Sequence, residues 1–286
     1  MSIDKLQVKQ LEERANRLRI EIIKIMGRYG YGHIGGSLSI AEMIAVLYFH
    51  ELKVDPKNPK WEDRDRFILS KGHACFTQYV ALAELGFVSK DVLRHPYEVD
   101  SPMQAHPELG EFPGIEMTTG ALGQGLSAGV GMAIGAKLRN RGFRIYVLLG
   151  DGEMNEGQVW EAIMLASKYK LDNLVALVDY NNFTLSGKTT EVMPLDPLME
   201  KFQAFGWCAM EVDGHSVEHL VAALDSARQI KDKPTAIIAH TIKARGFVPL
   251  ENKTESHAAN IKQEQAMEAL RALGCSESEI QQAFRE

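Results

Sequence analysis

Two apolar segments, each followed directly by a polar cluster, constrain the fold of this chain more than any other feature. Residues 145–149 and 174–178 are apolar on both faces, as expected of strands buried inside a parallel sheet. The sequence GDGE follows the first segment at 150–153, and DYNN follows the second at 179–182. Both clusters are therefore expected at the carboxyl ends of strands, where open α/β sheets place their ligand sites.

The spacing of the two clusters is that of one βαβ unit. Asp151 and Asn181 are 30 residues apart (181 − 151), so the two strand ends are expected side by side. A carboxylate and an amide oxygen are ligands that Mg²⁺ or Ca²⁺ takes when shared with a diphosphate, and a turn with two glycines lets backbone approach a phosphate. The residues alone leave one alternative, a tight turn with an Asp helix cap and an Asx turn at Asn181.

The remainder of the chain alternates helix and strand. Further strands are expected at 66–69, 208–212 and 235–241, and helices at 5–28, 40–52, after His73, after Gly125, and at 217–230. This alternation predicts an α/β fold with a three-layer, doubly wound, mostly parallel sheet. We expect one domain over residues 1–286, with a short helical tail from about Ile261. The proline-rich segment 93–114 is too long for a simple connector and is expected to be functional.

Composition excludes several classes of partner. The net charge is −6 and no basic run occurs, which argues against nucleic acid or a membrane surface and favours a small substrate. No stretch of eighteen apolar residues and no signal-peptide core at the amino terminus is found, so we expect a cytoplasmic protein. The three cysteines have no metal-ligand spacing and are expected to be free thiols: Cys75, Cys208 and Cys275.

Small residues recur every four positions on two adjoining faces of the helix expected after residue 124. They are Gly125, Gly129 and Ala133 on one face, and Ser127, Gly131 and Gly135 on the other. Such faces let a helix approach other backbones closely. Two interpretations stay open here, tight packing within the domain and a subunit interface.

The GDG cluster with NN thirty residues later resembles the thiamin diphosphate motif. In that family the Asp, an Asn of the pair and a backbone carbonyl two residues further on hold the metal. The resemblance implies that Asp151, Asn181 and the carbonyl of Phe183 bind Mg²⁺, with Ca²⁺ or Mn²⁺ as possible substitutes. It also implies the thiamin diphosphate-binding fold.

Four further stretches resemble the amino-terminal, diphosphate-binding domain of transketolase. They are GHIG at 32–35, DRDRFILSKGH at 63–73, AHPE at 105–108 and TTGALGQG at 118–125. Ile34, Ser37 and Ala121 each replace a proline of the family pattern. Full-length transketolases are more than twice this length. The chain therefore resembles the amino-terminal subunit of a split transketolase, completed by a carboxy-terminal subunit that supplies the pyrimidine-side glutamate in an α2β2 assembly.

The resemblance also assigns roles to site residues. It implies catalytic positions for His33, His73, His106 and His257, and for Glu156, which would link two cofactor sites across a dimer. His257 is aligned by position alone, because SHAA at 256–259 departs from the family's HG pairing. The cofactor-binding residues it implies are His73, Gly120, Ala121, Leu122, Gly152, Asn181 and His257. The other histidines are expected to be structural or at the surface: His50, His95, His215, His219 and His240.

The expected activity is transfer of a two-carbon ketol unit from a ketose phosphate, or an analogue, to an aldose. The main alternative is the α subunit of a 2-oxo-acid dehydrogenase, which shares the metal motif but does not need His33, His73 and His106 facing a sugar. Deoxyxylulose phosphate synthesis would require the missing domains on the same chain. A non-catalytic partner protein is disfavoured because Asp151, Asn181 and the histidines are intact. The sugars and the pathway, pentose phosphate or specialised sugar degradation, stay open.

Overall fold

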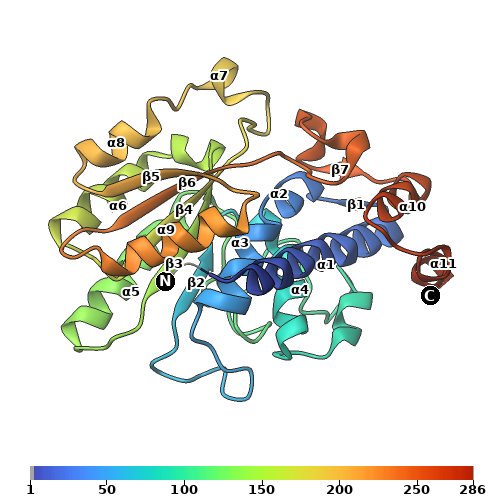
Figure 1. Ribbon diagram of the computed structural model, residues 1–286, viewed down its shortest axis with the longest axis horizontal. Helices are drawn as coiled ribbons and strands as arrows, with labels where there is room; N and C mark the ends of the chain where they lie inside the picture. The colour runs from blue at the N-terminus through green and yellow to red at the C-terminus, as the bar shows by residue number, and fades with distance from the viewer. Residues whose placement is uncertain (1–2, 286) are drawn as a thin grey trace.

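A five-stranded parallel sheet forms the centre of the computed structural model, which describes residues 3–285 (Figure 1). The strands lie in the order β2-β3-β4-β6-β5, and each neighbouring pair is parallel. Their bounds are β2 (Arg66–Leu69), β3 (Ile145–Gly150), β4 (Leu174–Tyr180), β6 (Thr235–His240) and β5 (Cys208–Asp213). The predicted doubly wound α/β fold is confirmed, and every strand of this sheet is parallel rather than most of them.

Alternate residues of the central strands enter two separate cores. Ile145, Val147 and Leu149 of β3 face one core, while Tyr146 and Leu148 face the other. Both faces of the sheet are therefore covered by helices, which is why residues 145–149 carry no charged side chain. One core contains side chains from α1 (Lys5–Tyr29), α3 (Ala41–Val46), α4 (Cys75–Leu85) and α9 (Val217–Gln229). The other contains side chains from α5 (Gln124–Leu138), α6 (Gly157–Lys168) and α8 (Leu198–Ala204).

The long helix α1 has distinct signals at both ends. Asp4 caps its amino terminus by accepting a 2.7 Å hydrogen bond from the N–H of Gln7. Gly30 ends it in the left-handed region at φ 81°, where a residue without a Cβ is favoured. The predicted helix at 5–28 is therefore confirmed to within one residue at its end.

A short antiparallel ribbon pairs a segment near the start of the chain with a segment near its end. β1 (Tyr31–Gly32) pairs with β7 (Ala259–Asn260), and the helical tail follows as α10 (Gln263–Ala272) and α11 (Glu277–Arg285), beside α1 (Figure 1). The expected tail is thus helical and begins two residues later than Ile261. His33 follows Gly32 and His257 precedes Ala259, so both histidines extend from the same end of this ribbon, which brings residues far apart in the sequence together.

Several elements differ from the prediction or were not predicted. The helix expected at 40–52 consists of α3 followed by a π-helical turn, η1 (Leu47–Glu51). Two short helices, α2 (Ile34–Ser39) and α7 (Thr189–Val192), were not predicted, and neither was α8. Single 3₁₀ turns complete the structure at η2 (Gly72–Ala74), η3 (Lys90–Arg94), η4 (Gly152–Asn155), η5 (Val248–Leu250) and η6 (Thr254–Ser256).

The long irregular segment between η3 and α5 was predicted and is confirmed. It buries Met103 and Phe112 in the core, with 0% and 1% of each side chain exposed. Phe112 stacks on Tyr79 of α4 with ring centroids 4.7 Å apart. These anchors hold the segment against the domain, so His106 within it has a defined place.

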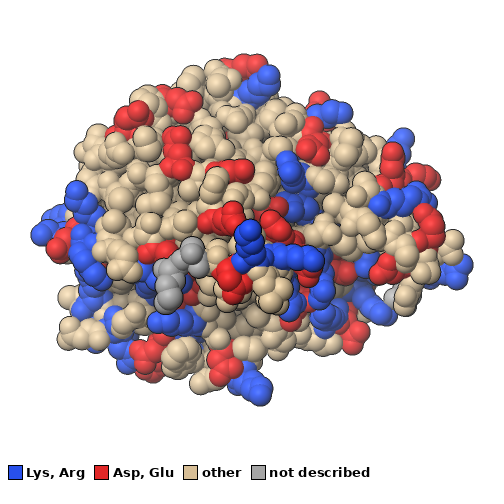
Figure 2. All heavy atoms as spheres, in the orientation of Figure 1, with Lys and Arg blue, Asp and Glu red and all other residues tan. Residues whose placement is uncertain are grey.

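The surface carries both signs of charge. Figure 2 shows Lys and Arg interspersed with Asp and Glu over the face presented, without a continuous basic area. None of the helices within residues 3–285 has the length and apolar character needed to cross a membrane.

Candidate cofactor and active site

The carboxyl ends of β3 and β4 lie side by side, as the spacing of the two polar clusters predicted. Gly150 pairs with Asp179 in the sheet register, and the N–H of Asp151 donates to the carbonyl of Asp179 at 3.2 Å. A cavity of about 290 Å³ opens at this edge. Its lining brings together residues from separate parts of the chain: Gly36, Lys71, His73, Leu122, Gly150, Asp151, Gly152, Glu153, Asn155, Asn181, Phe183, Thr184, Leu185, Ser186, Val192, Lys243 and His257.

The charged form of the Asp151 carboxylate is electrostatically unfavourable, because this group is buried. Only 2% of it is exposed, and its oxygens accept hydrogen bonds from the N–H groups of Gly152 (2.8 Å) and Asn182 (2.6 Å). Burial first, and then the charge of Asp179, raises the pKa of Asp151 to about 7. A divalent cation beside this carboxylate would offset that cost, because it favours the charged form.

Asn181 has a fixed amide orientation. Its Nδ2 donates to Asp179 at 2.9 Å, and its Oδ1 accepts from the N–H of Phe183 at 3.1 Å. One lone pair of Oδ1 is left for another ligand. The carboxylate of Asp151, the amide of Asn181 and residue Phe183 line the same cavity, which fits the oxygen-donor set that Mg²⁺ takes. Among residues 3–285, no group of three or more His, Cys, Asp or Glu side chains forms another candidate metal site.

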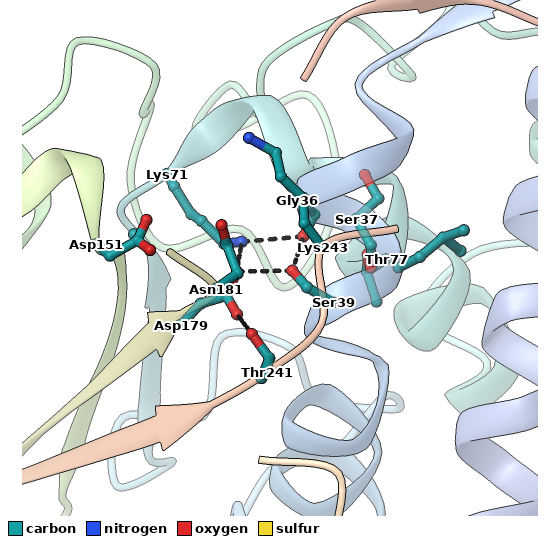
Figure 3. Close-up of polar contacts among 12 residues, drawn as sticks. Gly36, Ser37, Ser39, Lys71, Thr77, Asp151, Asp179, Asn181, Thr241 and Lys243 are labelled. Atoms are coloured by element: carbon teal, nitrogen blue, oxygen red, sulfur yellow. Dashed lines mark hydrogen bonds and ion pairs between the residues drawn. The ribbon is translucent and has the colours of Figure 1, made fainter. Parts of the chain in front are cut away.

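Beneath the cavity lies a buried ion pair, shown in Figure 3. Lys71 Nζ is 2.5 Å from Asp179 Oδ2 and donates to the carbonyl of Gly36 at 2.9 Å. Asp179 also accepts from the hydroxyls of Ser39, at 2.6 Å, and Thr241. Burial alone would raise the pKa of Asp179, but the Lys71 charge and these hydrogen bonds hold it below its usual value. The paired Asp179 fixes the amide of Asn181 in turn.

Lys243 is the second buried cation at the cavity, and its polar partner is weaker. Its Nζ donates to the carbonyl of Thr184 at 3.2 Å and lies 5.7 Å from the centre of the Phe183 ring. Burial is the first cause that lowers the pKa of Lys243 to about 8. An anionic ligand in the cavity would stabilise the charged form. Lys243 therefore suits a phosphate group better than Lys71, which is already paired with Asp179.

Four histidine rings gather at one side of the cavity. The ring centroid of His33 lies 5.5 Å from that of His73, 6.1 Å from His106 and 5.8 Å from His257, and His73 lies 4.8 Å from His257. Burial is the first cause that lowers the pKa of each ring, well below the usual value for His73 and to about 4 for His257. The rings are therefore neutral at neutral pH and can each donate one proton and accept another.

Gly120 shows why one motif glycine is needed beside this cluster. Its φ is 145°, and a Cβ placed on it would lie 2.7 Å from the ring of His106. Any side chain there would displace that histidine. The TTGALGQG stretch thus packs directly against the histidine cluster.

The sequence and the fold were compared with known proteins. The family model described as "Transketolase, thiamine diphosphate binding domain" matches residues 11–284. The chain belongs to this family. Its sequence is 42% identical over 254 residues to the 6-deoxy-6-sulfo-D-fructose transketolase subunit SqwG of Clostridium sp. (strain MSTE9), covering 89% of this chain and 92% of the relative. It is 41% identical over 266 residues to an apulose-4-phosphate transketolase subunit of Phocaeicola vulgatus, covering 93% and 94%.

Longer transketolases match over part of their length. Human transketolase is 40% identical over 271 residues, which is 94% of this chain but 43% of the human protein. The solved transketolase of Campylobacter jejuni superimposes with a TM-score of 0.89 at 32% identity, covering 97% of this chain and 46% of that one. The chain thus spans less than half of these proteins but nearly all of the two subunit relatives. Membership in the transketolase family also separates it from the 2-oxo-acid dehydrogenase alternative.

The positions of the predicted site residues in this transketolase-family chain fall into two groups. Most either line the cavity or belong to the histidine cluster: His33, His73, His106, Leu122, Asp151, Gly152, Asn181, Phe183 and His257. Ala121 and Glu156 are exposed and do not line the cavity. Glu156 lies at the amino end of α6, where its side chain approaches Gly123. Its role across a dimer stays a prediction, as does a role for Ala121.

The structure adds three residues that sequence reasoning did not single out: Lys71, Glu153 and Lys243. Lys71 and Glu153 each lie inside or next to a recognised motif, at 63–73 and 150–153. Lys243 lies three residues after the end of β6, at the edge of the sheet where ligand sites are expected. A search for charged residues just after every predicted strand would have found Lys71 and Lys243.

A change of His257 to Gln is expected to alter how stability depends on pH. The pKa of His257 is near 4 in the folded chain, below its usual value near 6.5, so the unfolded chain binds the proton more tightly between these values. The wild type therefore loses stability as pH falls from about 6.5 to about 4, and the variant escapes this loss. Allowing for solvent at a half-buried ring, the variant should gain about 1–2 kcal/mol relative to wild type over this range.

Urea denaturation at a series of pH values measures this difference. The matched variant is His219→Gln, an exposed histidine on α9 outside the cluster. A constant offset between His257→Gln and wild type from pH 7 to pH 4 would contradict the prediction.

Proposed function

We propose that this chain is the amino-terminal subunit of a two-chain transketolase that moves a two-carbon ketol unit from a ketose phosphate, or a close analogue, to an aldose. The observation that carries the proposal is that two sets of groups meet at one cavity, whose lining includes His73 and His257 of the histidine cluster. Asp151, Asn181 and Phe183 provide oxygen donors, and four neutral histidines stand beside them. The first set suits a metal with a diphosphate, and the second suits proton movement among sugar hydroxyls.

Each part of the cavity would meet a different part of the cofactor. Asp151, Asn181 and the carbonyl of Phe183 would hold Mg²⁺, and Gly152, His73 and Lys243 would face the diphosphate. When bound, thiamin diphosphate supplies the nucleophilic carbon and the electron sink for C–C cleavage. The protein's own work is to exclude water and to move protons. His33 and His257 would face the reacting oxygens and His106 a donor hydroxyl, since all three rings are neutral and partly accessible.

A second chain would complete the site. The cavity volume of about 290 Å³ is just below the roughly 300–1,000 Å³ typical of sites that enclose a whole ligand. Two relatives of matching length are named as subunits. We therefore expect a separate carboxy-terminal subunit that supplies the glutamate for the pyrimidine ring. We also expect the complex to act in the cytoplasm.

An exposed apolar face on α5 and α6 supports an α2β2 assembly. Leu138 at the end of α5 is 79% exposed, and Met164 and Tyr169 at α6 are 53% and 49% exposed. Gly131, also on α5, has an open surface, since a Cβ placed there meets nothing within 4 Å. Exposed apolar side chains on two helices that pack together are typical of an interaction surface. We propose that a second copy of this chain binds to this face. Of the two interpretations of the small-residue pattern, this one makes the helix a subunit interface.

Replacing Gly131 with Leu is expected to break this assembly without harming the fold. The added side chain has room in the single chain, and a helix gains roughly 0.5–1 kcal/mol when an interior glycine is replaced. At the proposed interface the same side chain would prevent close approach of the helices. Light scattering of the two-subunit complex should show its mass fall by half. Ala222→Leu, at an exposed position on α9, is the control, and an unchanged mass for Gly131→Leu would contradict the proposed interface.

The proposed function is tested with the chain co-expressed with the neighbouring reading frame of its genome. The purified complex is given thiamin diphosphate and Mg²⁺ and assayed for ketol transfer to aldose phosphates. The donors compared are xylulose 5-phosphate, 6-deoxy-6-sulfo-D-fructose and apulose 4-phosphate, the last two from the names of the relatives. Transfer from any of them supports the proposal and selects the pathway. A stable, cofactor-loaded complex that transfers from no ketose would refute it.

A further inference from the structure

Glu153 is a buried carboxylate that contacts three separate segments of the cofactor site. Only 2% of it is exposed. Its Oε1 accepts hydrogen bonds from the hydroxyl of Ser70 and from the N–H of Gly123, the latter at 2.9 Å. Its Oε2 accepts from the N–H of Gly150 at 3.1 Å. Among residues 3–285, no cationic side chain forms an ion pair with this buried carboxylate within 4.0 Å.

Each of the three segments carries residues of the proposed cofactor site. Ser70 precedes Lys71 and lies three residues before His73. Gly123 follows Leu122 in the TTGALGQG stretch, and its φ of 83° turns its N–H toward Glu153 at the start of α5. Gly150 ends β3 and precedes Asp151. A shift of any one segment would move a residue that faces the cavity.

The packing around Glu153 leaves little freedom for these segments. A Cβ on Gly125 would lie 2.4 Å from Ser70 Oγ, so the first turn of α5 rests directly on this serine. The N–H of Ser70 also donates to the carbonyl of Leu148 at 2.8 Å. The hydrogen bonds of Glu153 thus close a compact junction between β2, β3 and α5, at the wall of the cavity.

We propose that Glu153 is a positioning residue that fixes the Ser70, Gly123 and Gly150 segments in the arrangement that thiamin diphosphate and its metal require. The inference rests on the proposed function, since it assumes that this cofactor occupies the cavity. A carboxylate suits the task because it has two acceptor oxygens and no donor, and two of its partners are backbone N–H groups that can only donate. Preorganised loops lower the cost of ordering the site when the cofactor binds.

Glutamine is the informative substitution, because it keeps the size of the side chain and removes one acceptor. The amide NH₂ of Glu153→Gln must face at least one of the three donors. Ser70 can rotate its hydroxyl to accept from the amide, but the N–H groups of Gly123 and Gly150 cannot reverse. One of these two segments is then expected to move or loosen.

Glu51 provides a matched control. It is also a buried glutamate, 5% exposed, and it accepts from the hydroxyl of Tyr146 and from Arg228 Nε at 3.0 Å. It does not line the cavity. Glu51→Gln should therefore lower stability, as Glu153→Gln does, but leave cofactor binding unchanged.

The test uses the complex with its partner subunit, stripped of cofactor. Calorimetry with thiamin diphosphate and Mg²⁺ measures Kd, and amide hydrogen exchange without cofactor measures protection in segments 118–126 and 145–153. We expect Glu153→Gln to raise Kd about tenfold or more, the factor that matches one unsatisfied buried N–H. We also expect faster exchange in one or both segments, with neither change in Glu51→Gln. Ser70→Ala keeps the carboxylate and should raise Kd by a smaller factor, about threefold.

The outcomes separate this inference from the proposed function. If the wild-type complex does not bind thiamin diphosphate, the proposed function fails and the inference fails with it. If wild type binds and Glu153→Gln binds equally well, the inference alone is overturned. An equal rise of Kd in Glu51→Gln would also overturn it, by showing a general loss of stability. Should Glu153→Gln not fold, an unchanged Kd and unchanged exchange in Ser70→Ala would overturn it.

Discussion

Replacing Asp151 with Asn is expected to remove metal-dependent binding of thiamin diphosphate, with a loss of affinity of at least about 100-fold. Asp151 is the only charged group among the three proposed metal donors, the others being the amide of Asn181 and a carbonyl. Hard divalent cations depend on carboxylate charge for their affinity. The amide oxygen of Asn can still accept from one of the two N–H groups, Gly152 or Asn182, but the other loses its acceptor, a cost of about 1–3 kcal/mol that is separate from the loss of metal affinity. Calorimetry with and without Mg²⁺ measures the effect.

The same substitution is expected to stabilise the chain when no metal is bound. Burial raises the pKa of Asp151 to about 7, above its usual value near 3.8, so the folded chain binds this proton more tightly than the unfolded chain. Stability from this group is therefore present at low pH and lost as pH rises through about 7. At pH 8 the Asn variant avoids the buried charge, which costs a few kcal/mol, but loses one acceptor for a backbone N–H, so its net gain in stability should be about 1–2 kcal/mol. A site that costs stability without its ligand is typical of functional positions.

Asp65 is the matched control for this prediction. It is another buried aspartate, 4% exposed, and it accepts from the N–H groups of Lys53 and Arg144 at 2.9 and 2.8 Å, next to the start of β2. Burial raises its pKa too. Asp65→Asn should change stability and leave metal and cofactor affinity as in wild type. Unchanged affinity in Asp151→Asn would show that the metal site is misassigned.

Local sequence predicts the sheet and the metal donors because each depends on contacts within one βαβ unit. The absence of charged residues from 145–149 and 174–178 indicates that both strands are buried. Their spacing then determines that Gly150 and Asp179 become neighbours. Asp151 and Asn181 are placed by this register, so their meeting in one cavity follows from a local pattern.

The histidine cluster depends on contacts that no local pattern reveals. His33 and His257 meet because β1 pairs with β7, two strands of two residues each, with Tyr31 opposite Asn260. Strands this short show no periodicity. Similarly, α2 forms over a segment with two glycines, which have poor helix propensity. Gly35 is needed there because a Cβ would lie 2.5 Å from Ser256 Oγ, so close packing decides the residue type. Only the family resemblance pointed to these histidines.

The buried charged residues show a further limit of prediction from the sequence. Lys71 and Asp179 are 108 residues apart, and the partners of Asp179 come from the ends of α2 and β6 as well as from β4. A buried charged residue requires an oppositely charged partner close to it in the fold, but the sequence does not reveal which residue that partner is. The role of Glu153 could not be predicted from the sequence either, because its partners are mainly backbone N–H groups, which every residue except proline has.

The isolated chain is expected to transfer ketol units at least about 10³-fold more slowly than its complex with the partner subunit. This chain carries the proposed metal donors, the proposed diphosphate contacts and the histidine cluster, and two relatives of similar length are named as subunits. The glutamate expected to start cofactor activation would come from the partner, and losing a positioned proton-transfer group costs roughly 10²–10⁴-fold. Loss of the opposite wall of the site would add to this by admitting water.

Titration of the partner subunit into this chain, with cofactor and donor in excess, measures the dependence. Activity should rise linearly with partner and level off at one partner per chain. The control is Asp151→Asn, which should bind the partner and stay inactive, because its defect lies at the metal and its interface is intact. Turnover by the isolated chain within tenfold of the complex would contradict the prediction. Saturation at one partner for two chains would instead show that one site per assembly is enough, and the α2β2 arrangement would have to be replaced.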